Sequence, residues 1–158
     1  MKSRWKYPIA LLAMVALGCQ FLASTPALAE EDPPTLAESL AAAKEQGRPL
    51  MILGTAHACG SCVILKKRLQ SEEAIQESVA QFVHHVVYLD EDQQLEPFME
   101  QFELSMDDLA APMMYVVNAD GEHVATKLGL PAGDELGTFL SEALKKANAK
   151  ANAKKDAS

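Results

Sequence analysis

The sequence has little cysteine and little positive charge. Of its 158 residues three are cysteines, and 14 basic residues stand against 22 acidic ones, which gives a net charge of −8. An acidic protein repels phosphate backbones, so the composition argues against a nucleic-acid partner. A structural zinc site takes four ligands, whereas only two cysteines and four scattered histidines follow residues 1–29. A zinc site is therefore not expected.

The sequence also lacks an apolar run of the usual length for a transmembrane helix. The candidate, residues 7–23, is short and contains Gln20, which places it at the lower end of the membrane-spanning range. Three basic residues precede this run and Ala27-Leu28-Ala29 follows it, which is the pattern of a secretory signal with an A-x-A cleavage site. We therefore expect residues 1–29 to be a signal peptide, cleaved after Ala29, and the protein to be periplasmic.

Two alternatives to cleavage after Ala29 stay open. Gly18-Cys19 fits a lipoprotein signal, although Ala16 stands where leucine is usual, and an uncleaved signal would anchor the chain. A membrane partner is expected only in these two cases. If the signal is removed, both remaining cysteines belong to one motif, and export brings them to a compartment in which disulfides persist.

This motif, Cys59 and Cys62, follows an apolar run and begins a predicted helix. Residues 50–53 are too few for a helix and suit a strand covered on both faces, which Gly54 and Thr55 are expected to end. Cysteines three apart in the first turn of a helix lie on one face, so they can form a disulfide. The helix N-terminus stabilises a Cys59 thiolate. The pattern predicts thiol–disulfide exchange, and an inert structural disulfide is the alternative.

The rest of the chain predicts one α/β domain, because no second hydrophobic core is apparent. We expect a tether over residues 30–35, the domain over residues 36–147, and a flexible or frayed helical tail over residues 148–158. Ser71 is expected to be the N-cap of the third helix. The expected elements are helices over residues 36–46, 59–69, 72–80, 93–102 and 134–146, and strands over residues 50–53, 82–89, 113–117 and 123–128.

In this order the segments resemble the thioredoxin-like superfamily, and look closest to exported domains such as the C-terminal domain of DsbD-type thiol reductases. Three stretches carry the resemblance: Gly-Thr-Ala-His-Ala-Cys-Gly-Ser-Cys after a buried strand, residues 71–75 leading into residues 86–90, and the hairpin segment that begins with Ala111-Pro112. The resemblance implies an α/β, thioredoxin-like three-layer sandwich, in which helices flank a central mixed sheet of about four strands.

The resemblance also implies roles for individual residues. Cys59 looks like the attacking cysteine and Cys62 like the resolving one. Pro112 looks like the cis-proline beside the disulfide, and Ala111 and Ala58 are expected to contact a bound peptide. Ala58 is also a departure, because the family usually has tryptophan before the first cysteine.

A second departure is Leu53, which stands where the family often has a buried acid that serves proton transfer to the resolving thiol. His57 is the nearest titratable group and the candidate for proton transfer, the alternative being an ordinary loop histidine. The expected function is a monomeric thiol–disulfide oxidoreductase that acts on protein disulfides, exchanges electrons with a thiol redox partner, and needs no cofactor or metal. The alternative is a non-catalytic binding module or a copper(I) carrier that uses the same cysteines.

Overall fold

The computed structural model describes residues 33–156, with side chains up to residue 153. The predicted signal peptide, the alternative lipid site at Cys19 and the start of the predicted tether lie outside these residues. Within the described part, no helix combines the length and the hydrophobicity needed to cross a membrane. In chain order the elements are α1 (Leu36–Gln46), β1 (Leu50–Thr55), α2 (Gly60–Ser71), α3 (Glu73–Val79), β2 (Val83–Tyr88), α4 (Asp92–Phe102), the short 3-10 helix η1 (Met106–Asp108), β3 (Met113–Val117), β4 (His123–Leu128) and α5 (Glu135–Asp156).

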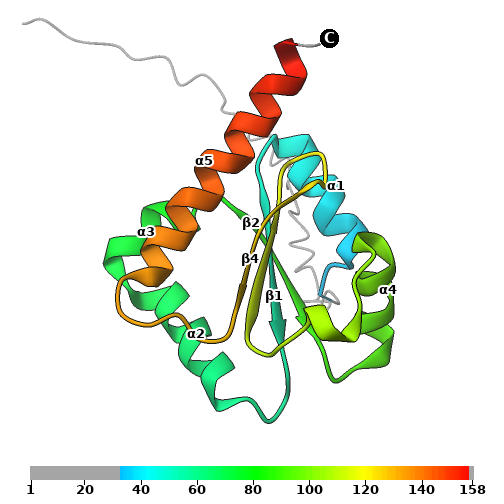
Figure 1. The fold of residues 1–158 in the computed structure, drawn as a ribbon, viewed down its shortest axis with the longest axis vertical. Coiled ribbons are helices and arrows are strands. Elements are labelled where there is room, and N and C mark those ends of the chain that lie inside the picture. The colour runs from blue at the N-terminus through cyan, green and yellow to red at the C-terminus, as the bar shows by residue number, and fades with distance from the viewer. Residues whose placement is uncertain (1–32, 157–158) are drawn as a thin grey trace, which may run out of the picture. The chain divides into compact units, whose positions relative to one another are not determined.

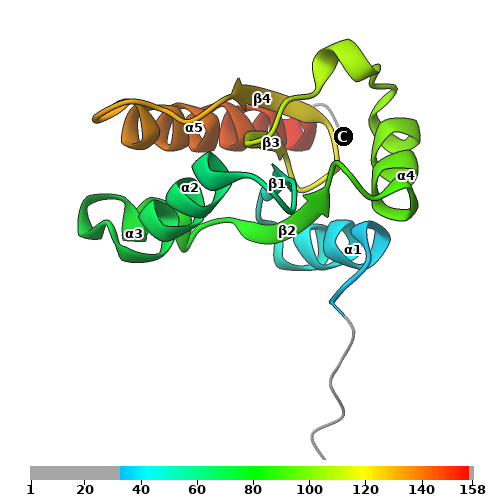
Figure 2. The ribbon, with the colours of Figure 1, turned by 90° about the horizontal axis from the view of Figure 1, so that it is seen from below.

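The four strands form one mixed sheet in the order β2-β1-β3-β4. β1 is parallel to β2 and antiparallel to β3, and β4 returns antiparallel beside β3. Helices α1 and α4 cover one face of the sheet, and α2, α3 and α5 cover the other (Figures 1 and 2). The predicted three-layer arrangement around a four-stranded mixed sheet is thus confirmed.

Each face of the sheet has its own hydrophobic core, and β1 contributes to both. Leu50 and Ile52 pack with residues of α1 and α4, whereas Met51 packs with residues of α2, α3 and α5. All three side chains are fully buried. A strand covered on both faces needs apolar side chains at consecutive positions, which explains why this stretch has no polar alternation.

The structure corrects the predicted end of this first strand. β1 continues through Gly54 and Thr55, which pair with Met113 of β3 and Tyr88 of β2. A Cβ atom on Gly54 would lie 2.3 Å from Cγ of Met113. Glycine is therefore needed here because the side chains of Met113 and Leu89 fill the space that a Cβ atom would occupy, and it does not mark a strand end.

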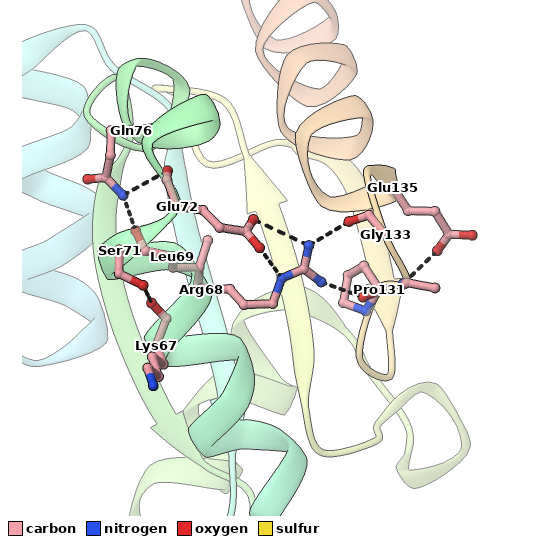
Figure 3. Close-up of polar contacts among 10 residues, drawn as sticks. Lys67, Arg68, Leu69, Ser71, Glu72, Gln76, Pro131, Gly133 and Glu135 are labelled. Carbon is pink, nitrogen blue, oxygen red and sulfur yellow. Dashed lines mark hydrogen bonds and ion pairs between the residues drawn. The ribbon is translucent and has the colours of Figure 1, made fainter.

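Two helix boundaries also differ from the predictions. Ser71 is the last residue of α2 and donates its hydroxyl to the carbonyl oxygen of Lys67 at 2.8 Å, so it is not an N-cap (Figure 3). The N-cap of α3 is Glu72, without a side-chain capping bond. Helix α5 continues to Asp156, past the predicted end near residue 146. Its last turns are rich in alanine and lysine, which have high helix propensity. That the tail is flexible stays a prediction.

Candidate active site

The two cysteines lie at the start of α2, after the loop that follows β1. Cys59 is the N-cap residue and Cys62 lies in the first turn. They form a disulfide, with their Cα atoms 5.2 Å apart. Cys59 is partly exposed, whereas Cys62 is only 3% exposed. The pair is therefore unequal in access, in the direction that the proposed roles require.

The backbone around Cys59 is arranged to stabilise negative charge on its sulfur. The N–H of Cys62 donates to Cys59 Sγ at 3.1 Å, and the Ser61 hydroxyl lies 3.5 Å from the same sulfur. The positive end of the helix dipole adds to these donors. After reduction, the same contacts favour the thiolate of Cys59, which is the nucleophilic form.

Both cysteines open into one small pocket of about 190 Å³. Residues from β1, the following loop, α2 and the end of β2 share its lining: Thr55, Ala56, His57, Val63, Lys66 and Tyr88. The pocket therefore brings three titratable side chains to the cysteines, one from each of the loop, the helix and β2.

His57 lies in this pocket but is held by two carboxylates. Its ring nitrogens are 3.1 Å from Asp90 Oδ2 and 3.1 Å from Glu91 Oε1, and its backbone N–H donates to Asp90 Oδ2 at 2.9 Å. That backbone hydrogen bond is the main cause of the lowered pKa of Asp90, and the His57 ring contributes further. With both nitrogens engaged, the ring is not arranged as a free base beside the cysteines. Its role in proton transfer stays a prediction.

Tyr88 and Lys66 complete the pocket and were not identified from the sequence. The Tyr88 ring stacks on the His57 ring with centroids 4.7 Å apart, and Lys66 Nζ lies 5.3 Å from the Tyr88 ring centroid. Lys66 follows Cys62 by four residues, so the helical period puts both on one face of α2. This spacing was the available signal. No feature of the sequence indicated Tyr88, because its approach to the loop depends on the pairing of β2 with β1.

The residues expected to contact a peptide lie at the same end of the sheet. The Ala111–Pro112 peptide bond is cis, in agreement with the resemblance. Because Met113 pairs with Gly54, Pro112 is opposite the last residue of β1, from which the cysteine loop begins. Ala111 and Ala58 are exposed and Pro112 is buried. The register thus places Pro112 near the start of the loop that contains Ala58, while contact of Pro112 or Ala111 with Cys59 stays a prediction.

Among the described residues, no group of three or more His, Cys, Asp or Glu side chains is arranged to hold a metal ion. The two sulfurs are bonded to each other, and the ring nitrogens of His57 face carboxylates. The geometry therefore gives the copper(I) alternative no third ligand from His57.

Comparison with known proteins agrees with the fold described above. A family model described as thioredoxin-like matches residues 31–119. Three solved structures resemble the chain: a thioredoxin from Thermus thermophilus (18% identity, 74% of this chain and 89% of that one, TM-score 0.59), a DsbH oxidoreductase (16%, 72% and 84%, 0.57) and a thioredoxin h from poplar (20%, 66% and 84%, 0.51).

None of the curated proteins compared with the chain matches it. Identities this low show that the fold is shared and do not transfer an activity. The closer resemblance to the C-terminal domain of DsbD-type reductases stays a prediction.

Proposed function

The chain belongs to the thioredoxin-like family, and from this premise we propose that it is an exported, monomeric thiol–disulfide oxidoreductase that acts on protein disulfides. One observation carries the proposal: a partly exposed Cys59 sulfur accepts a backbone hydrogen bond at a helix N-terminus, while its bonded partner Cys62 is buried behind it. A purely structural disulfide has no need for this difference in access and charge stabilisation.

The reaction proceeds in two exchange steps. The thiolate of Cys59 attacks one sulfur of the partner disulfide, a bond forms between Cys59 and that sulfur, and the other partner sulfur leaves with the electron pair. Cys62 then attacks Cys59 Sγ, which releases the second partner sulfur as a thiolate. The partner gains two electrons and takes up protons from water, and the Cys59–Cys62 disulfide forms again. A thiol redox partner returns the two electrons.

The surface beside Cys59 supports a protein as the substrate. Ala58, which precedes Cys59 in the chain, is small and exposed, so it leaves room for a partner chain to approach the sulfur, and Ala111 is also small and exposed. On α2, the neighbouring side chains of Val63 and Ile64 are 67% and 51% exposed, so they offer an apolar surface next to Cys62. An extended, partly apolar segment of a partner would find both space and apolar contact here.

Trapping tests the assignment of roles. Cys62→Ser removes the resolving thiol, so mixed disulfides between Cys59 and partner proteins should accumulate and be visible on non-reducing gels. Cys59→Ser is the matched control and should trap almost none. In parallel, the wild-type protein should accelerate the reduction of insulin by dithiothreitol. Equal trapping by both variants would contradict the assignment.

The same preparation separates the proposed function from its alternatives. If titration shows that the reduced protein binds copper(I), and the protein does not accelerate insulin reduction, a copper carrier would be favoured. Failure in both assays would leave a structural disulfide or a binding module. Intact mass of protein from the native host tests export, because we expect an N-terminus at Glu30 without lipid.

A further inference from the structure

The resolving cysteine faces a chemical difficulty in this pocket. Cys62 is 3% exposed, and burial disfavours a thiolate. Leu53 occupies the position of the buried acid that the resemblance would supply, and it packs against the core formed with α2, α3 and α5. Attack on the mixed disulfide therefore needs another group that lowers the free energy of forming the Cys62 thiolate.

Few charged or titratable side chains near Cys62 could stabilise its thiolate. Besides the cysteines, the described residues that line the pocket include three such groups: His57 from the loop, Lys66 from α2 and Tyr88 from β2. Asp90 and Glu91, which follow β2, contact His57. On α2 itself, Lys67 is exposed and does not line the pocket, and Arg68 contacts Glu72. Lys66 is thus the residue that brings an ammonium group to the pocket of Cys62.

A chain of contacts restricts where the Lys66 side chain can go. Its Nζ lies 5.3 Å from the Tyr88 ring centroid, within the range of a cation–π interaction. Tyr88 stacks on His57, whose two ring nitrogens are each 3.1 Å from a carboxylate oxygen. The Tyr88 backbone N–H is also fixed, because it donates to Gln94 Oε1 at 3.1 Å. These contacts hold the ammonium group over the ring, beside the pocket.

We propose that Lys66 stabilises the thiolate of Cys62 during attack on the mixed disulfide, and that Tyr88 and His57 are positioning residues for it. The proposal rests on the proposed function of the same site. The Cys62 thiol gives its proton to water in the pocket, its sulfur attacks Cys59 Sγ, and the electron pair leaves on the partner sulfur. Lys66 neither gives nor takes a proton in this step and contributes only its positive charge, which lowers the free energy of forming the Cys62 thiolate.

A direct test measures the ionisation of Cys62 without any partner. In full-length protein with Cys19→Ala and Cys59→Ala, Cys62 is the sole thiol, and the ultraviolet absorbance of its thiolate is followed across pH. Lys66→Met should reduce the thiolate population near neutral pH about threefold to tenfold, as expected for loss of a nearby cation. Lys66→Arg should retain the population, and Lys67→Met is the matched control.

Tyr88 is tested as a positioning residue in the same background. Tyr88→Phe keeps the ring and should leave the titration unchanged, whereas Tyr88→Leu removes it and should lower the thiolate population partway toward the Lys66→Met value. Thermal unfolding checks that each variant is folded. A Lys66→Met titration that matches both the parent and Lys67→Met would overturn the proposal.

A kinetic test uses full-length protein with Cys19→Ala and with Cys59 and Cys62 intact. Reduced protein reacts with dithiobis(nitrobenzoate) in two steps. Cys59 first forms a mixed disulfide with the reagent, and Cys62 then attacks Cys59 and releases thionitrobenzoate. The rate of this second step reports on resolution. Lys66→Met should slow this second step about threefold to tenfold near neutral pH, and the difference should disappear at alkaline pH, where Cys62 ionises without help. An unchanged second step would overturn the proposal even if insulin is reduced. Failure of insulin reduction with normal titration and resolution would instead count against the proposed substrate.

Discussion

At the scale of single residues, Gly54 shows how tightly the side chains around β1 are packed. A Cβ atom here would be 2.3 Å from Met113 Cγ, 3.0 Å from Met113 Sδ and 3.1 Å from Leu89 Cδ1. Met113 is fully buried, so its side chain has little room to move aside. We expect Gly54→Ala to lower the free energy of unfolding by about 1–3 kcal/mol, the usual cost of overpacking a core.

Gly60→Ala is the matched control for this experiment. No atom lies within 4 Å of the Cβ position at Gly60, which is the first residue of α2. Alanine is favoured over glycine in helices by up to about 1 kcal/mol, so this variant should be as stable as the wild type or slightly more stable. Urea unfolding followed by circular dichroism measures both. Equal stability of the two variants would show that the side chains of Met113 and Leu89 can rearrange to admit a methyl group.

At the scale of elements, Arg68 joins the cysteine helix to the segment before α5. Its Nε donates to Glu72 Oε1 at 2.7 Å, while its two terminal nitrogens donate to the carbonyl oxygens of Pro131 and Gly133, each at 2.6 Å (Figure 3). The side chain is 18% exposed. A planar group with several donors is required to reach three acceptors at once, which favours arginine over lysine.

We expect Arg68→Met to lower the free energy of unfolding by about 2–4 kcal/mol, because hydrogen bonds from a charged group typically contribute 1.5–3 kcal/mol and two carbonyls lose their donor. Arg68→Lys should recover only part of the loss. Lys67→Met is the control on the same helix and should change little, since the Lys67 side chain is exposed. A loss no greater than that of the control, in the same urea experiment, would mean that the loop is held by its other contacts.

At the scale of the whole domain, the sequence predicts the architecture better than the boundaries. The apolar runs in β1 and β3 identify buried strands because both faces of the sheet are covered, and the order of the elements then leads to the three-layer fold. The errors at Gly54 and Ser71 have a common cause. From local sequence alone, glycine is expected to end a strand and serine to cap a helix. Tertiary packing decides whether they do so in the folded chain.

The candidate site was predictable only in part for the same reason. Cys59 and Cys62 could be found from local spacing, since their chemistry depends on one helix turn. Tyr88 lies 26 residues after Cys62 in sequence and reaches the pocket only because β2 pairs with β1 in a fixed register. His57 was identified as titratable, but its contacts with Asp90 and Glu91 depend on that same pairing.

We expect three histidines to make the stability of the domain depend on pH. Desolvation by neighbouring groups is the main cause of the lowered pKa of His84, His85 and His123, although the side chains of His84 and His123 stay exposed. His84 Nε2 lies 3.1 Å from the Val79 carbonyl oxygen, and His85 Nδ1 lies 2.9 Å from the hydroxyl of buried Ser39. All three are neutral in both states well above pH 6.5. As the pH falls through about 6.5, the unfolded chain binds protons first, so stability is lost.

We therefore expect the melting temperature to fall as the pH is lowered from about 7.5 to about 5.5, a window set by the reference histidine pKa of about 6.5. The carboxylates with lowered pKa values, among them Asp108 and Glu135, lose their contribution only at more acidic pH, because they titrate below the usual range near 4. His84→Gln combined with His85→Gln should flatten the decline between these limits. A decline of the same size in the double variant would assign the pH dependence to other groups, and a melting temperature that rises toward pH 5.5 would contradict the sign of the three pKa shifts.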